Sequence, residues 1–352
     1  MSFPRPPDSK SAVRRAGAAI ASLSTDQKDY DLVDQWRASH GYVINTFQIF
    51  LKRKIEKSKI NIEFAQRLKR RNTVIDKLRR RDAAGNPLIS DVTSMHDFAG
   101  CRMIFGSLAE LHDFRSYVHS PQVMRNVEHK LRHEADKYDY IAKPKSTGYR
   151  GIHDVYRHFP RGSARKEGSK PWDGLHVEIQ YRTRAQHAWA TAVEISDLLD
   201  GEKTKFEMDQ SSRGRFFALA SEIIARNVEG ANNAFHGRTT EELKSELDEL
   251  ENQLGILRRL EALKQFEDEE KLGRHNVLNI YQNDQGKLEL EVIPYKSATQ
   301  AVEKATELEE SGISLNAVYV GSENPRQLRS AYRNYFNDPL DFVAMIRGEM
   351  SY

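Results

Sequence analysis

Two carboxylates stand among cations in segments whose patterns predict β-strands. Asp97 opens an apolar segment, and Glu178 lies in a segment that alternates polar and apolar residues. Because side chains alternate between the two faces of a strand, Glu178, Gln180 and Arg182 are expected on one face. Such a face is often simply solvated, but two carboxylates amid cations also suit a divalent metal ion bound to phosphates.

A basic segment and a glycine-containing loop supply the cations. Residues 67–77 contain Arg67, Lys69, Thr73 and Lys77, and positions 73 and 77 share a face if this segment is a helix. Taken alone, a basic helix is more often a solvated face. The loop segment gathers cations around one aromatic ring: Lys137, Lys143, Lys145, Tyr149, Arg150 and His153. Cations with an aromatic ring suit a phosphorylated ligand that carries a stackable base.

The composition excludes several classes of protein. The 352 residues include 54 Lys and Arg against 51 Asp and Glu, for a net charge of +3, and a single cysteine, Cys101. One cysteine excludes an intrachain disulfide framework and a cysteine-cluster zinc site. We expect no secretory signal, and no membrane span, since no apolar run approaches about 20 residues. The predicted location is therefore the cytoplasm.

Charge is unevenly distributed along the chain. Residues 52–81 contain 13 Lys and Arg but 3 Asp and Glu, whereas residues 241–270 contain 11 acidic and 4 basic residues. The basic stretch predicts a polyanionic ligand, either nucleotide phosphates or a nucleic-acid backbone. The acidic stretch is typical of a solvated helix.

The predicted elements give an α+β fold, with a mixed β-sheet flanked by helices. Apolar residues at three-to-four spacing predict helix through residues 26–81. Strands are predicted at 97–106, 137–142, 151–160 and 175–183, and further helices at 109–120, 186–199 and 213–227. Leucines at 243, 247, 250, 254 and 257 have heptad spacing, either to pack on their own chain or to pair in a dimer.

The C-terminal part predicts a small ββαβα module of its own, with a hairpin turn at 283–286. We therefore expect a flexible N-terminus (1–25) that contains one short helix at 11–22, a catalytic domain (26–230), an acidic helical connector (231–272) and the C-terminal module (273–352). The module contains two tyrosines, Tyr332 and Tyr335, on one face of its last helix. On periodicity alone, these tyrosines pack the core of the module.

The four chemistry-bearing segments, in this order, resemble the synthetase domain of the RelA/SpoT family. Their sequences are RLKRRNTVIDK, DFAGCR, KYDYIAKPKSTGYRGIH and VEIQYRT, within residues 36–200. The family transfers pyrophosphate from ATP to a ribose 3′-hydroxyl, on a mixed sheet flanked by helices. The resemblance implies the same fold and activity here. Tyr138 stands where the family usually has a lysine, which leaves open whether Lys137 takes that role.

The resemblance also implies a role for each matching residue. Implied ATP-binding residues are Arg67, Lys69, Thr73, Lys77, Arg102, Lys145, Gln180 and Arg182, with the adenine between Arg67 and Arg102. Implied catalytic residues are Asp97, Glu178, Tyr149 and His153. Asp97 and Glu178 are the implied Mg²⁺ ligands, and Glu178 also accepts the proton of the attacking hydroxyl. Tyr149 stacks on the acceptor base, and His153 lies along the phosphate path.

Two further segments, WRASH and TRAQHAWATAVEI, resemble a toxic branch of the family that includes the fused toxin–antitoxin synthetases called CapRel. This resemblance implies the 3′-CCA end of tRNA as acceptor, inhibition of translation, and phage defence. It implies a block of the ATP site by Tyr332 and Tyr335, which a phage structural protein releases. Candidate tRNA-binding residues are Lys52, Arg53, Lys54, Arg70 and Arg71. The alternatives are an alarmone synthetase acting on GDP or GTP, and a non-enzymatic nucleotide- or RNA-binding module.

Overall fold

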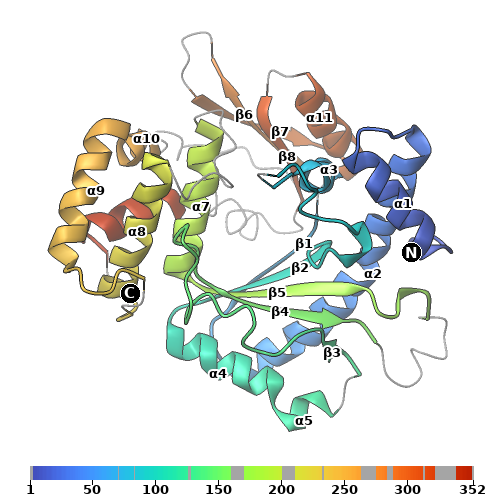
Figure 1. Ribbon diagram of the computed structural model, residues 1–352, viewed down its shortest axis with the longest axis horizontal. Helices are drawn as coiled ribbons and strands as arrows, with labels where there is room; N and C mark the ends of the chain where they lie inside the picture. The colour runs from blue at the N-terminus through green and yellow to red at the C-terminus, as the bar shows by residue number, and fades with distance from the viewer. Residues whose placement is uncertain are drawn as a thin grey trace. The chain divides into compact units, whose positions relative to one another are not determined.

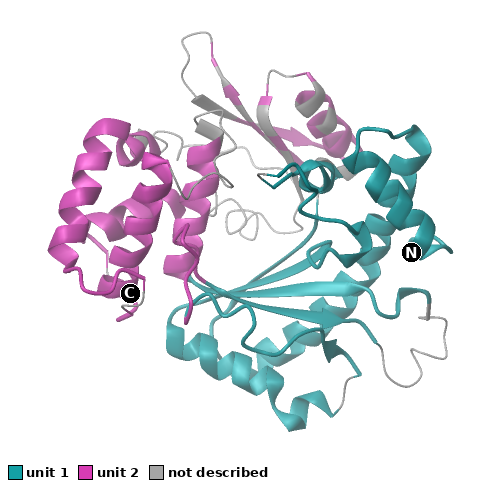
Figure 2. Cartoon of the chain, in the orientation of Figure 1, with its two compact units in different colours: residues 1–141, 151–183 teal, residues 142–150, 184–352 magenta. Residues whose placement is uncertain are grey.

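The computed structural model describes residues 3–69, 71–82, 84–125, 128–159, 170–199, 211–231, 234–262, 275–283, 288–311, 314–321 and 338–350 (Figure 1). The chain divides into two compact units (Figure 2). Unit 1 comprises Met1–Ile141 and Gly151–Thr183, and unit 2 comprises Ala142–Arg150 and Arg184–Tyr352.

Unit 1 is built on a five-stranded mixed sheet with the strand order β1-β2-β5-β4-β3. The strands are β1 (Glu63–Leu68), β2 (Ala99–Phe105), β3 (Lys130–Leu131), β4 (Ile152–Arg157) and β5 (His176–Thr183). β2 and β5 are parallel, and the other neighbours are antiparallel. The helices are α1 (Lys10–Ala21), α2 (Gln27–Ser58), α3 (Arg71–Arg79), α4 (Leu108–His119) and α5 (Pro121–Met124), with 3-10 turns η1 (Val92–Ser94) and η2 (Lys170–Trp172). The predicted α+β fold with a mixed sheet is confirmed.

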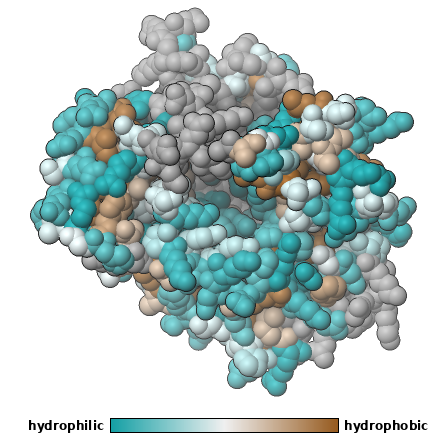
Figure 3. Space-filling view, viewed as in Figure 1, coloured by the Kyte–Doolittle hydropathy of each residue, from teal (hydrophilic) through white to brown (hydrophobic). Residues whose placement is uncertain are grey.

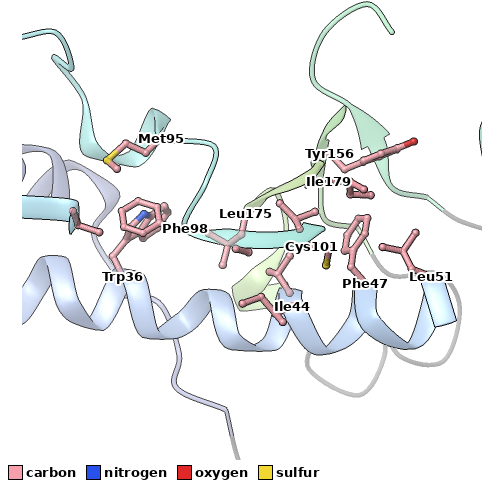
Figure 4. Packing of buried hydrophobic residues seen from close by; sticks show 14 of the residues in the cluster. Trp36, Ile44, Phe47, Leu51, Met95, Phe98, Cys101, Tyr156, Leu175 and Ile179 are labelled. Atoms are coloured by element: carbon pink, nitrogen blue, oxygen red, sulfur yellow. The ribbon is translucent and has the colours of Figure 1, made fainter. Parts of the chain in front are cut away.

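One face of this sheet is apolar and packs against α2 and α4. Figure 4 shows Phe47 of α2 beside Cys101 of β2 and Ile179 of β5. The ring of Phe114 from α4 lies 5.6 Å from that of Phe105, and all five side chains are buried. Burying an aromatic or aliphatic side chain of this size contributes about 1.5–3 kcal/mol. Because side chains alternate along a strand, the polar residues of β5 fall on the opposite face.

The long helix predicted for residues 26–81 is wrong, since the segment folds as helix, strand and helix. Asp26 caps α2 through a reciprocal capping box with Asp29, and α2 ends at Lys59, which has a left-handed φ of 59°. β1 follows as an edge strand in which residues 65–67 are all exposed. An exposed edge strand lacks the apolar alternation that marks a strand in sequence, so this segment is predicted as part of the helix on either side of it.

The short helix predicted in the N-terminal segment is present as α1, but the segment is not loosely held, because α1 packs into the core of unit 1. Ser9 caps α1 by accepting a hydrogen bond from the amide of Ala12. Val13, Ile20 and Ala16 are buried. The small residues that suggested a loose segment are those that allow α1 to approach its neighbours closely.

The strand predicted for residues 137–142 is also wrong, because this segment forms consecutive turns. Asp139 forms a single isolated bridge with Ile152, and its carboxylate accepts a hydrogen bond of 3.0 Å from the amide of Ile141. Such a side-chain contact two residues along the chain favours a turn over a sheet ladder.

Unit 2 contains helices α7 (Arg184–Leu199), α8 (Ser212–Val228), α9 (Thr240–Leu254) and α10 (Ile256–Ala262). Leu243 and Leu247 of α9 are buried in a cluster with residues of α7 and α8. Gly255, with a φ of +64°, ends α9 and breaks the heptad pattern before Leu257. The leucines therefore pack on their own chain, one of the two predicted alternatives.

The C-terminal part contains β6 (His275–Gln282), β7 (Leu288–Tyr295), α11 (Ala298–Glu310) and β8 (Ser314–Gly321), in an antiparallel sheet of order β7-β6-β8. This agrees with the predicted ββαβ order, while the predicted turn at 283–286 and last helix, with Tyr332 and Tyr335, fall mostly or wholly outside the described residues. A helix over 338–347 contributes Phe342 and Met345 to the cluster of α7 and α8.

The described surface shown in Figure 3 is mostly hydrophilic, and its hydrophobic residues form small separate groups. Among the described helices, none combines the length and the apolar character needed to cross a bilayer.

Candidate active site

The register of β1, β2 and β5 aligns Glu178 with Arg67, and Gly100 lies between them. On the sheet face opposite α2 and α4, Arg67 of β1 pairs with Gly100 of β2, and Gly100 pairs with Glu178 of β5. Arg67 is exposed and Glu178 is half-buried. Gly100 has no side chain, so the surface between the guanidinium and the carboxylate is formed by backbone.

The next row of the same face carries a hydrogen-bonded chain that ends on Glu178. Arg102 pairs with Gln180, and Gln180 pairs with His153 of β4. The Nε of Arg102 donates to Oε1 of Gln180 at 3.4 Å, and Nε2 of Gln180 donates to Oε1 of Glu178 at 2.6 Å. The Nδ1 of His153 lies 3.5 Å from the same carboxylate oxygen. These contacts hold the Glu178 carboxylate in one orientation.

The environment keeps Glu178 ionised. Burial raises the pKa of Glu178, but His153, the hydrogen bond from Gln180 and the charge of Lys77 together hold that pKa well below its usual value. A carboxylate with a low pKa is a good ligand for a cation and a weak proton acceptor near neutral pH.

Asp97 lies between two lysines. The antiparallel pairing of β1 and β2 continues in the hydrogen bond from the amide of Lys69 to the carbonyl of Phe98, which brings Lys69 beside Asp97. The Nζ of Lys69 lies 2.6 Å from Oδ2 of Asp97, and the Nζ of Lys77 on α3 lies 3.0 Å from the same oxygen. Burial raises the pKa of Asp97, but the two lysines outweigh it, so the pKa lies below its ordinary value.

The two carboxylates act on each other electrostatically. Glu178 opposes the lysines and raises the pKa of Asp97, while the charge of Lys77 lowers the pKa of both acids. Among the described residues, no set of three or more His, Cys, Asp or Glu could hold a metal ion by itself. Mg²⁺ commonly takes one or two carboxylates and completes its shell with water and substrate phosphates. The pair Asp97 and Glu178 fits that mode of binding.

The other predicted residues of unit 1 differ in accessibility. Arg102 and Thr73 are half-buried, and Thr73 lies one turn before Lys77 on α3. Arg182 is buried, with 7% of its surface exposed. It follows Gln180 on the same face of β5, so the predicted row of three polar side chains is present, with its last member least accessible.

Lys145 and Tyr149 lie on a loop that belongs to unit 2. The Nζ of Lys145 is 5.3 Å from the centre of the Tyr149 ring. Arg150 is not the ligand-facing cation that its sequence neighbours suggested, because its side chain is 3% exposed and forms an ion pair with Glu222. Its position in a basic segment gave no sign of a buried partner 72 residues away.

The candidate tRNA-binding residues do not form one patch. Lys52 and Arg53 are exposed near the C-terminal end of α2, and Lys54 lies 5.6 Å from the ring of Phe50. Arg71 instead lies 5.7 Å from the ring of Tyr30, near the start of α2. Because a helix rises about 1.5 Å per residue, Tyr30 and Lys52 are roughly 33 Å apart. Arg70 lies outside the described residues.

Two aromatic residues near the carboxylates were not singled out by the sequence. The ring of Tyr140 lies edge-on, 5.5 Å from that of His153. His96 directly precedes Asp97, and burial, aided by Arg132, lowers the pKa of His96 to about 4, so its ring is neutral at pH 7. Neither residue stands out by type or spacing: Tyr140 reaches His153 through the turns around 137–142, and His96 lies next to Asp97 in the chain.

Comparison with solved structures finds similar chains at low identity. The small alarmone synthetase 1 from Bacillus subtilis, bound to its product pppGpp, is 19% identical, with a TM-score of 0.40, covering 61% of this chain and 94% of that one. A GTP pyrophosphokinase family protein from Streptococcus pneumoniae is 18% identical, with a TM-score of 0.37, covering 61% and 92%. The Bacillus subtilis enzyme bound to AMPCPP is 15% identical, with a TM-score of 0.34, covering 52% and 85%.

The search of curated proteins finds no match. A protein-family comparison matches residues 66–196 to the family described as "Region found in RelA / SpoT proteins". The matched segment starts in β1 and ends in α7, and it contains Asp97, Glu178 and Tyr149. Residues 66–196 of this chain therefore carry a RelA/SpoT region.

Proposed function

We propose that this protein is an ATP-dependent pyrophosphokinase that transfers the β,γ-pyrophosphate of ATP to a ribose 3′-hydroxyl. The observation that carries this proposal is the carboxylate pair Asp97 and Glu178, set among Lys69 and Lys77 inside the RelA/SpoT region. A module that only binds nucleotides has no need of two ionised carboxylates beside its phosphate-binding cations. This argues against the non-enzymatic alternative.

In the proposed reaction, the 3′-hydroxyl oxygen attacks the β-phosphorus of ATP. A new P–O bond forms, the bond between the β-phosphorus and the oxygen bridging to the α-phosphate breaks, AMP leaves, and the hydroxyl proton passes to solvent water. Lys69 and Lys77 leave their ion pairs with Asp97 and bind the phosphates of ATP instead. Their positive charges offset the negative charge of those phosphates. Asp97 and Glu178 would hold Mg²⁺, which would supply Lewis-acid stabilisation of the triphosphate.

Glu178 acts in this proposal as a cation ligand rather than as the proton acceptor. Its low pKa would make proton transfer to it unfavourable. Gln180 and His153 hold its Oε1 at 2.6 and 3.5 Å, so they position the carboxylate. Arg67 and Arg102 are assigned to the adenine, and Tyr149 to the acceptor base.

The acceptor that we propose is the 3′-CCA end of tRNA, so that the product blocks translation. The exposed Lys52 and Arg53 on α2 lie outside the matched RelA/SpoT region. They add positive charge beyond the number of cations that a mononucleotide requires, as a nucleic-acid backbone would need. The second candidate is an alarmone synthetase acting on GDP or GTP. It is favoured by the place of the assigned nucleotide-binding residues, which all fall within residues 66–196, so that a mononucleotide acceptor needs no cation outside that region.

We further propose that the C-terminal module restrains the enzyme in the cytoplasm until a partner, such as a phage structural protein, binds it. Tyr332 and Tyr335 are the proposed blocking residues. Their segment is followed by the helix over 338–347, in which Asp338 lies 3.2 Å from Nε2 of His187 on α7. Thr191 of α7 donates to the same carboxylate at 3.4 Å. These contacts attach Asp338 to α7, the helix that directly follows β5.

A label-transfer assay tests the proposed activity and its acceptor. Full-length protein carrying Tyr332→Ala and Tyr335→Ala is incubated with Mg²⁺, γ-labelled ATP, bulk tRNA, and GDP plus GTP. Label on tRNA that is lost when the 3′-terminal adenosine is removed supports the tRNA acceptor. Label only in guanosine nucleotides supports the second candidate. No label in either pool, with Asp97→Asn giving the same background, would overturn the enzymatic proposal.

A further inference from the structure

The loop that carries Lys145 and Tyr149 is packed against helix α8 within unit 2. Ser221 of α8 donates from Oγ to the carbonyl of Gly148 at 2.5 Å and accepts from Nε of Arg150 at 3.3 Å. These hydrogen bonds reach the residues on both sides of Tyr149. The backbone around this ring is therefore fixed by a helix far along the chain.

Gly148 allows this close packing. Its φ is +87°, a conformation that residues with a side chain rarely adopt. A Cβ atom at this position would lie 2.8 Å from the Cα of Ala218 and 3.0 Å from the carbonyl oxygen of Phe217. The loop and α8 thus meet through backbone atoms, which leaves little freedom for the loop to shift while this contact holds.

A buried ion pair completes the attachment. The Nη2 of Arg150 donates to Oε2 of Glu222 at 2.5 Å, and the two side chains are 3% and 0% exposed. Glu222 also accepts from Nε of Arg226 at 3.0 Å and from the amide of Ala234 at 3.3 Å. A buried carboxylate needs such partners because water cannot solvate it. Removing Glu222 would leave the charge of Arg150 buried beside Tyr149.

We propose that Ser221 and Glu222 of α8 are positioning residues that set the affinity for the acceptor by fixing the Tyr149 loop. The inference rests on the proposed function, in which Tyr149 stacks on the acceptor base. It extends the site beyond the RelA/SpoT region, which ends at residue 196. Loss of either residue weakens acceptor binding much more than ATP binding, because Lys145 is the one assigned ATP-binding residue on this loop, whereas Lys69 and Lys77 belong to unit 1.

The alternative is that the ion pair only stabilises unit 2. That role would make all substrate affinities fall together, or change none of them while the melting temperature falls. Leu247→Ala on α9 provides the matched control, since Leu247 is buried in the same unit and its truncation leaves a cavity without removing a hydrogen bond to the loop.

The experiment compares Ser221→Ala, Glu222→Gln and Leu247→Ala in the full-length protein carrying Tyr332→Ala and Tyr335→Ala. The first readout is amide hydrogen exchange of residues 142–150, which we expect to rise about ten-fold in Ser221→Ala and Glu222→Gln but not in Leu247→Ala. The second readout is the KM for whichever of tRNA or GDP accepts label, which we expect to rise roughly five- to ten-fold while the KM for ATP changes less than about two-fold.

Unchanged exchange in folded Ser221→Ala overturns the inference, as does a parallel rise of both KM values. If Glu222→Gln does not fold, Ser221→Ala decides the question, since it removes hydrogen bonds without leaving a buried charge. If the reference protein transfers no label to any acceptor, the proposed function fails. The exchange result then still decides whether α8 fixes the loop.

Discussion

The ammonium of Lys69 lies 2.6 Å from the carboxylate of Asp97, and this contact joins the end of β1 to the start of β2. The side chains are 10% and 23% exposed. Burial lowers the pKa of Lys69, and Asp97 partly offsets that effect. The carboxylate thus opposes the effect of burial on the pKa of Lys69, and in the proposed reaction a phosphate group takes the place of this carboxylate.

Asp97→Asn should lower pyrophosphate transfer by roughly 100-fold or more, since the substitution removes one of two carboxylates for the metal and the anchor of two lysines. Asp91→Asn is the matched control. Asp91 also pairs with an arginine in unit 1, and its N-cap role on η1 is one that asparagine fills equally well. Transfer by Asp97→Asn at the rate of Asp91→Asn would contradict the mechanism.

The two carboxylates should not limit activity above about pH 5, because their pKa values lie below the ordinary range for Asp and Glu. Each carboxylate stays ionised until the pH falls below its lowered pKa. Lys77→Met removes a charge that lowers both pKa values, so the acid limb of kcat/KM should move to higher pH as the rate falls. An acid limb at the same pH in both proteins would argue against this coupling.

Protonation of buried histidines should make unit 1 unstable in mild acid. Burial lowers the pKa of His40 and His158 to about 4, and that of His129 and His176 to about 3, from 6.5. Below pH 6.5 the unfolded chain binds protons that the folded chain does not, so the free energy of unfolding falls as pH falls from 6.5 towards 4. His129→Asn should reduce the slope of this decline, as measured by urea unfolding at pH 7 and pH 5. An equal slope would exclude His129 as a contributor.

Reversing the charges of Lys52, Arg53 and Lys54 to Glu should abolish modification of tRNA and spare transfer to GDP. The physical reason is that tRNA binding depends on many phosphate contacts, whereas a mononucleotide requires fewer cations than this basic surface supplies. The matched control reverses Lys28, Lys130 and Arg157, which are exposed elsewhere in unit 1. If tRNA modification survives the first triple change, this surface is not the tRNA platform.

Tyr332→Ala or Tyr335→Ala should make the protein toxic on expression if the C-terminal module restrains it. These substitutions are preferable to truncation after residue 272, which would also remove the helix over 338–347. Phe342 of that helix is fully buried, so truncation should expose the core of unit 2 and yield poorly folded protein. Growth of cells expressing each variant is the measurement, with Asp97→Asn added to show that toxicity requires catalysis. A non-toxic but active Tyr332→Ala variant would contradict the restraint.

Local patterns determined much of the site in advance. The alternation that places Glu178 and Gln180 on one face is a property of any extended segment, so β5 and its polar row were predictable. The same holds for Asp97 at the start of β2, because a short apolar run with a polar first residue identifies a buried strand wherever it pairs.

Contacts between distant segments could be decided only by the tertiary structure. β1 is a strand because β2 pairs with it, while its own residues, three of them exposed in succession, show no apolar alternation. Arg150 forms a buried ion pair with Glu222 instead of facing a phosphorylated ligand, because α8 places that carboxylate beside its guanidinium group. The length of α2 separates Lys52 from Arg71, although both fall within one basic run of the sequence. Sequence thus set which side chains face the same way along one element, and folding set which of them meet across elements.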